Sequence, residues 1–117
     1  MKYNITIGIT GNDWTECIEA ADDGCAEVIA NDEFKAKSYG SLQNVNIYIA
    51  EVNYNRDFGE YSAGAEITGE VMIEIERPDD NVKAAIKQAY AEAAQMDFGD
   101  LDIDSLAWKS TCYSTVN

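Results

Sequence analysis

The chain has 117 residues, 46% of them hydrophobic, which predicts one folded domain over residues 1–117 and excludes a disordered chain. Its 22 acidic and eight basic residues give a formal charge of −14, which argues against direct binding to nucleic acid or to anionic membranes. No apolar run is long enough for a membrane span and no signal peptide opens the chain, so we expect a cytoplasmic protein.

The residue types also exclude several kinds of chemistry. The chain has no histidine, so Ser-His and Cys-His nucleophile pairs and histidine metal ligands are excluded. Its cysteines are Cys17, Cys25 and Cys112, an odd count without a CxxC pair that fits free thiols in a reducing compartment. We predict no catalytic residue, cofactor site or metal site, and we expect the protein not to be an enzyme.

The first strand is predicted over Tyr3–Thr10, where apolar residues at odd positions alternate with polar ones. Capping residues at 10–13 then predict a helix over about 13–37, in one piece or in two around Gly24. Its apolar stripe is Trp14, Cys17, Ile18, Ala21, Cys25, Val28 and Ile29, which would bury Cys17 and Cys25. Its other face carries Glu16, Glu19, Asp22, Asp23, Glu27, Asp32 and Glu33.

A second strand is predicted over Asn44–Asn55, with a blurred phase near Ala50 that suggests a bulge or a strand covered on both faces. The segment 55–64 is predicted to be a long polar loop that carries Phe58 and Tyr61 at its tip. These two aromatic residues either fold back on the core or anchor a binding partner.

The third predicted strand, Ala65–Glu76, has the most informative pattern in the chain. Its apolar positions are Ile67, Val71, Ile73 and Ile75, and the alternate positions include Glu66, Glu70, Glu74 and Glu76. This period predicts a strand with one face in the core and a ladder of carboxylates on the other. At about 3.3 Å per residue, Glu74 and Glu76 would lie roughly 6–7 Å apart, a spacing closer to a phosphate backbone than to a catalytic pair.

The last third of the chain is predicted to hold a helix and a strand. Pro78 ends the third strand, and Asp79 or Asp80 caps a helix from about Asp80 to Met96. The acids of residues 100–104 do not form an EF-hand, because Ser105 and Thr111 stand where Gly and Glu are needed; a short edge strand or an acidic loop is expected instead. A fourth strand is predicted over Leu106–Val116.

The resulting order is βαββαβ, which predicts an α+β ferredoxin-like fold with a four-stranded antiparallel sheet and two helices on one face. The acidic ladder would lie mid-sheet on the open face. RNA-binding domains of similar topology carry basic and aromatic residues on that face, so the sign of the charge is inverted here. The competing hypothesis is dimerisation across that face, which buried unpaired carboxylates would oppose.

In size, charge and the layout of its acidic patches the chain resembles phage-encoded anti-defence proteins, both anti-CRISPR inhibitors and DNA-mimic antirestriction proteins. The resemblance implies a monomer or dimer, in the host cytoplasm, that binds a basic nucleic-acid-binding protein such as a nuclease or a CRISPR effector. The predicted partner-binding residues are Glu66, Glu70, Glu74, Glu76, Asp79, Asp80, Glu16, Glu19, Asp22, Asp23, Glu27, Phe58 and Tyr61. Two alternatives remain open: an immunity protein or antitoxin against a basic nuclease, and a virion or homo-oligomer component whose acidity only aids solubility.

Overall fold

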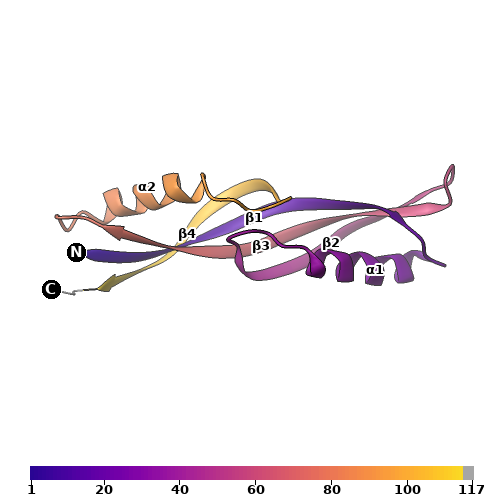
Figure 1. Ribbon diagram of the computed structural model, residues 1–117, viewed down its shortest axis with the longest axis horizontal. Helices are drawn as coiled ribbons and strands as arrows, with labels where there is room; N and C mark the ends of the chain where they lie inside the picture. The colour runs from indigo at the N-terminus through magenta and orange to yellow at the C-terminus, as the bar shows by residue number, and fades with distance from the viewer. Residues whose placement is uncertain (115–117) are drawn as a thin grey trace.

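The computed structural model describes residues 1–114, which form four strands and two helices (Figure 1). In chain order these are β1 (Lys2–Ile18), α1 (Asp23–Ala36), β2 (Gln43–Asn55), β3 (Glu60–Glu76), α2 (Val82–Ala93) and β4 (Asp102–Ser114). All strand pairs are antiparallel, in the order β2-β3-β1-β4. The predicted acidic ladder therefore does lie in a central strand, β3.

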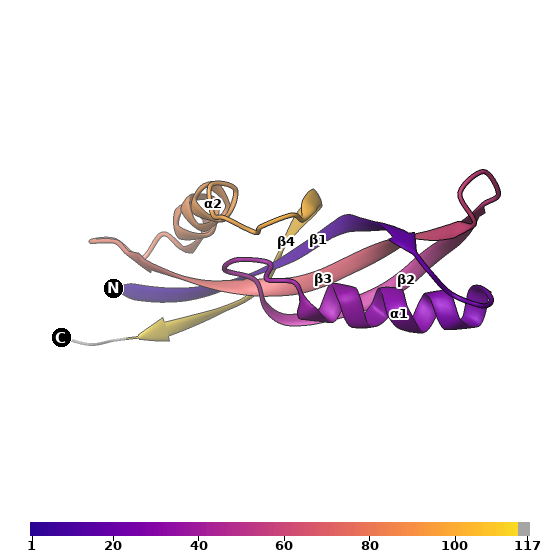
Figure 2. The same ribbon diagram turned by 45° about the vertical axis from the view of Figure 1, so that its right-hand side comes forward.

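The molecule is a slender, twisted body of 62 × 19 × 17 Å (Figures 1 and 2). Its radius of gyration is 18.4 Å, whereas a compact domain of this length has a value of about 13 Å. The length comes from β1 and β3, which have 17 residues each and so extend over roughly 58 Å at about 3.4 Å per residue.

The core lies on the face formed by the odd-numbered residues of the two central strands. Tyr3, Ile5, Ile7 and Ile9 of β1 are buried, and so are the four apolar ladder residues of β3, Ile67, Val71, Ile73 and Ile75. The predicted alternation is therefore confirmed in both strands. Both strands run further than predicted, β1 to Ile18 and β3 back to Glu60.

The prediction of a helix over residues 13–37 is wrong over residues 13–22. Residues up to Thr15 continue β1 in register with β3, with Gly11 opposite Ile67 and Thr15 opposite Ala63. Helix α1 begins at Asp23, where the side chain of Asp22 accepts a hydrogen bond of 2.8 Å from the backbone N–H of Cys25. Pairing with a long neighbouring strand thus outweighs the helical spacing of the apolar residues in this segment.

Corrections also follow for the side chains on the predicted helix stripe. Trp14 lies in β1 above Gly64, where a Cβ atom would be 3.0 Å from the indole ring. Cys17, the next-to-last residue of β1, has a left-handed φ of 59° and lies where the strand register shifts, between Thr15 and Ile18. Cys17 and Cys25 are both exposed, so the prediction of buried thiols is wrong.

The predicted ferredoxin-like architecture is wrong, because the helices do not form a shared layer. Helix α1 packs at the β1–β2–β3 end through Ala26, Ala30 and Phe34, and α2 packs at the other end of β1 and β3 (Figure 2). Within residues 1–114 the two helices do not contact each other. Helices of 14 and 12 residues span only about 21 and 18 Å, so each covers one end of the long sheet.

Two loops cover the middle of the sheet between the helices. They bury Tyr39 and Leu42 from one side and Phe98 and Leu101 from the other, and Ser41 N–H donates to the Asp97 carbonyl at 2.9 Å. Each central strand has a glycine at the point where one of these loops crosses it, Gly69 in β3 and Gly11 in β1. A Cβ atom at Gly69 would lie 2.5 Å from Leu42, and one at Gly11 would lie 2.7 Å from Leu101. We call this crossing of residues 38–42 and 97–101 the waist.

The other predicted boundaries shift by smaller amounts. Strand β2 begins one residue early, and the predicted loop over 55–64 is only a turn at 56–59 between β2 and β3. Helix α2 is shorter than predicted at both ends. Strand β4 begins at Asp102, so the acids of 102–104 lie in an edge strand. Thr115 and Val116 of the predicted fourth strand lie outside the described residues.

Candidate functional site

The predicted carboxylate ladder faces solvent on the sheet face that carries no helix. Glu66, Glu74 and Glu76 are exposed, and Glu70 is half-buried. Register places Asn12 beside Glu66 and Asn4 beside Glu74 on the neighbouring strand β1. The ladder is therefore a real surface feature, at the spacing that the strand period predicts.

Lysine and asparagine side chains neutralise or bind the middle of this ladder. Glu70 accepts hydrogen bonds from Asn44 Nδ2 at 2.6 Å and from Lys109 Nζ at 3.3 Å. Lys109 reaches it from β4 by crossing β1 at Gly8, where a Cβ atom would be only 2.9 Å from Lys109 Cε. The hydrogen bond from Asn44, and then the one from Lys109, lowers the pKa of Glu70 below its usual value.

The other end of the ladder is paired as well. Lys2 Nζ lies 3.4 Å from Glu74, and Arg77 binds Asp79 through Nε at 2.9 Å and Nη2 at 3.1 Å. The hydrogen bonds from Arg77 lower the pKa of Asp79. Asp80 is exposed beside this pair. Three predicted partner-binding residues of this region are therefore exposed and outside every described ion pair: Glu66, Glu76 and Asp80.

The structure brings the second group of predicted residues together at the α1 end of the molecule. The end of β1, the start of α1 and the β2–β3 turn meet there (Figure 1). We call this surface the acidic end; its residues are Glu16, Glu19, Asp22, Asp23, Glu27, Asp57 and Glu60. The surrounding segments, 13–36 and 51–66, hold twelve of the 22 acidic residues and two of the eight bases. They carry a formal charge of −10 out of −14.

Two acids of this end also stabilise the fold. Asp22 is the N-cap of α1, and the hydrogen bonds from the backbone N–H and then the thiol of Cys25 lower its pKa. Asp23 lies in the first turn, where a negative charge interacts favourably with the helix dipole. Glu16, Glu19 and Glu27 are exposed, and within the described residues none of them is in an ion pair. These three carry charge without a structural role and are the better binding candidates.

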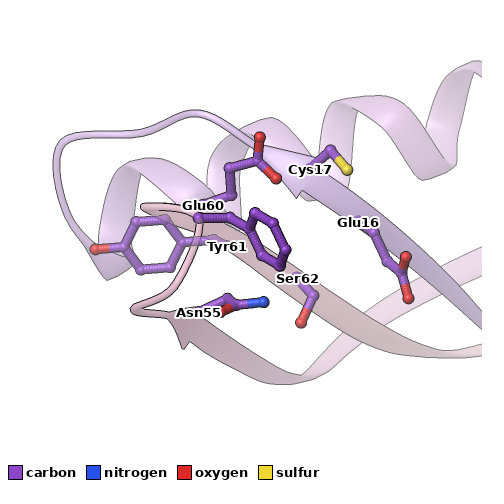
Figure 3. Close-up of a pocket in the computed structure, with 7 residues that line it drawn as sticks. Glu16, Cys17, Asn55, Glu60, Tyr61 and Ser62 are labelled. Carbon is purple, nitrogen blue, oxygen red and sulfur yellow. The ribbon is translucent and has the colours of Figure 1, made fainter.

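A shallow pocket of about 300 Å³ opens at the acidic end (Figure 3). Its lining residues are Glu16, Cys17, Asn55, Phe58, Glu60, Tyr61 and Ser62. Phe58 lies at the tip of the turn and is 74% exposed, as a partner anchor requires. Tyr61 is only 8% exposed and its ring centroid is 4.9 Å from that of Tyr54, so Tyr61 packs against the sheet and Phe58 is the accessible one of the two predicted anchors.

The thiol of Cys17 at this pocket is not activated. A hydrogen bond with Glu60, and the negative charge of that carboxylate, raise the pKa of Cys17 above its ordinary value. Because the thiolate is the reactive form of cysteine, a raised pKa lowers the fraction available as a nucleophile. The pocket therefore offers an aromatic and acidic rim and no activated thiol.

Sequence reasoning missed the one buried charged residue of the described core, Asp13. It is 7% exposed and accepts hydrogen bonds of 2.9 Å from both Lys37 Nζ and Tyr39 Oη. Burial, and then the hydrogen bond with Asp13, raises the pKa of Tyr39. One sequence signal could have revealed its burial: the odd-numbered residues of β1 face the core, and this alternation continues through Gly11 to Asp13. The cluster ties the end of α1 to the sheet beside the waist.

Replacing Asp13 with asparagine is expected to destabilise the protein by about 2 kcal/mol, because the hydrogen bonds that Asp13 accepts from Lys37 and Tyr39 lose the negative charge of their acceptor. Urea unfolding followed by circular dichroism measures this. Tyr39→Phe, which removes only one hydroxyl group, should cost about 1 kcal/mol. An Asp13→Asn protein as stable as the wild type would contradict a stabilising role for the cluster.

Among residues 1–114 no group of three or more Cys, Asp or Glu side chains could hold a metal ion. In the same part of the chain, neither helix has the length and apolar character that crossing a membrane requires. Comparison of the chain with protein-family models, with curated proteins and with solved structures finds no match. The resemblance to anti-defence proteins therefore remains a prediction from size and charge.

Proposed function

We propose that the protein is an acidic inhibitor that binds the basic nucleic-acid-binding surface of a nuclease or a CRISPR surveillance complex, as a DNA mimic or a steric block. The observation that carries this proposal is the acidic end. It gathers most of the net charge on one half of a slender body, and its free carboxylates Glu16, Glu19 and Glu27 face solvent. Such a surface attracts a basic groove and repels nucleic acid itself.

Shape and charge density support the same proposal. A formal charge of −14 over a length of 62 Å is about one charge per 4 Å. A single nucleic-acid strand carries one charge per roughly 3.4 Å of axis, and a duplex carries one per roughly 1.7 Å. The chain therefore approaches the linear charge density of a single strand, and its cross-section of 19 × 17 Å would fit a groove that accepts a nucleic acid.

Phe58 would add an aromatic contact to this electrostatic interaction. Its ring is the most exposed large apolar side chain of the described residues, and it lies in the same turn as Asp57. Arginine and lysine side chains of a basic groove can stack on an aromatic face while they pair with neighbouring carboxylates. In this arrangement the charges steer the approach and the ring limits dissociation.

A pull-down from host lysate with the tagged protein, washed at increasing salt, tests the proposal. We expect one basic nucleic-acid-binding protein to be retained at 0.1 M salt and released by added DNA or by 1 M salt, because the screening length falls from about 10 Å to about 3 Å over that range. Recovery of a nuclease would also be the result expected of an immunity protein or antitoxin, the related alternative. Retention of no basic protein would overturn the proposal.

A second candidate function, an assembly component, is favoured by the two long edge strands of the sheet. Strands β2 and β4 each have 13 residues and end the sheet on either side. Exposed edges are a common route to association between chains. Light scattering in high salt separates the two candidates. Large assemblies that persist in high salt indicate an assembly component. A monomer or dimer that has no activity without a basic partner indicates an inhibitor.

A further inference from the structure

The edge strand β2 differs from the rest of the surface in its lack of charge. Residues 38–50, which lead into β2 and form its first half, contain no charged residue, the longest such run in a chain of which 26% is charged. The strand itself has a single ionisable acid, Glu51, and no lysine, arginine or proline. Charges and proline are the usual devices that keep an edge strand from pairing with another chain, and this edge has almost none.

Several apolar side chains in the middle of this edge are accessible. Tyr48 is 70% exposed, and Ile47 and Ile49 are only partly covered. Val28 of α1 is 62% exposed and lines a groove of about 470 Å³ together with these strand residues. Apolar side chains that border the core are therefore left partly exposed along this side, between the helix and the edge strand.

The amount of exposed surface indicates what could cover this edge. The chain has an accessible surface of 7308 Å² at 12.9 kDa, whereas folded monomers of this mass expose about 6,300 Å². The excess of roughly 1,000 Å² is close to the 800 Å² that each partner buries in a stable protein complex of standard size. An interface of that size on each of two copies would restore the surface expected for folded protein.

We propose that two copies of the chain pair through their β2 strands, antiparallel, to form one eight-stranded sheet. Residues directly opposite in an antiparallel pair lie on the same face, so a two-fold axis passing through Tyr48 sets Tyr48 of one copy against Tyr48 of the other. Ile47 of each copy then lies opposite Ile49 of the other on the core face, beside Val28. Aromatic and β-branched cross-strand pairs of this kind stabilise sheets.

Charge also favours this arrangement over other self-contacts. Two chains of −14 repel each other, so association is expected at the least charged edge. Antiparallel pairing directs the acidic end of each copy toward the less acidic remainder of the other copy, which has ten acids and six bases and carries −4 of the formal charge of −14. The remaining repulsion, in which Glu27 beside the groove takes part, is screened by salt. We therefore expect the dimer to strengthen as salt increases.

Disulfide trapping tests the register. The exposed cysteines are first removed by Cys17→Ser, Cys25→Ser and Cys112→Ser, and Tyr48→Cys or Asn46→Cys is then added. Opposed residues have Cβ atoms about 4.5–5.5 Å apart, so mild oxidation should link Tyr48→Cys into a covalent dimer. The Asn46→Cys residues would lie roughly 13 Å apart and should not be linked. Absence of the Tyr48→Cys dimer, or equal linking of both variants, would overturn the register.

Sedimentation equilibrium of the unmodified chain tests the dimer itself. We expect a species of twice the chain mass whose dissociation constant falls between 0.05 and 0.5 M salt. Tyr48→Lys should weaken the dimer at least about tenfold, whereas Trp108→Lys on the other edge strand β4 should leave it unchanged. A monomer under all conditions, or a loss caused by Trp108→Lys alone, would overturn the proposal. The inhibitor proposal is measured separately by partner capture, so each can fail without the other.

Discussion

Replacing Gly40 with alanine is expected to destabilise the protein by at least about 4 kcal/mol. Gly40 has a φ of +61° at the waist, and a Cβ atom there would lie 2.0 Å from the Asp97 carbonyl oxygen and 3.1 Å from Phe98 Cα. These neighbours are backbone atoms of the opposing loop and cannot move aside as a side chain would. The loops must separate, which exposes the apolar residues that cover the middle of the sheet.

Gly59 provides the matched control, because its φ of +65° is almost the same but its Cβ position is open, with Tyr54 Oη at 3.9 Å as the nearest atom. Gly59→Ala should cost only about 1 kcal/mol, from the left-handed backbone alone. Thermal unfolding should show a decrease of roughly 15 °C or more for Gly40→Ala and a few degrees for Gly59→Ala. Equal decreases would show that the backbone conformation matters and the waist contact does not.

The waist also marks what the sequence could predict and what it could not. Strict alternation in Tyr3–Thr10 and Ala65–Glu76 predicted the two central strands and their buried faces, since a period of two is a local property. Nothing local predicted that Gly11, paired with Ile67, and Gly69, paired with Ile9, would leave room on the sheet for the side chains of Leu101 and Leu42. That arrangement depends on the strand register and on two loops far apart in the chain.

The two main errors have a common cause in the length of the strands. Residues 13–18 have helical spacing, but β3 is long enough to pair with them, so Trp14 and Asp13 became strand residues. The same length separates α1 from α2 and removes the shared helix layer of a ferredoxin-like fold. Element order can be read from the chain, whereas strand length depends on the partner strand and is less reliably read.

The sequence predicted which acidic residues form the two candidate binding surfaces, but not which of the two surfaces is the stronger candidate. The ladder and the patch over Glu16–Glu27 were both visible as acidic runs, with no means to choose between them. The structure shows that Lys109 and Lys2 approach the ladder from distant parts of the chain, while the acidic end has few bases nearby. Long-range pairing of charges, which a sequence pattern does not contain, makes the acidic end the stronger candidate.

Reversing the charge of Glu16, Glu19 and Asp57 to lysine is therefore expected to weaken binding to the captured partner at least about 100-fold. All three side chains are exposed, and none is the helix cap or an ion-pair partner among the described residues. The fold should remain intact, which circular dichroism can verify. Surface plasmon resonance at 0.1 M salt measures the affinity, and the association rate should fall most because the charges steer the approach.

A matched variant separates location from total charge. Glu92→Lys, Asp102→Lys and Asp104→Lys change the net charge equally, also at exposed positions outside every described ion pair, but lie outside the acidic end. They should weaken binding less than about tenfold, through the long-range field alone. Glu66→Lys with Glu76→Lys tests the unpaired part of the ladder in the same way. If the matched variant and the acidic-end variant lose equal affinity, the partner senses only net charge, and the acidic end has no specific role in recognition.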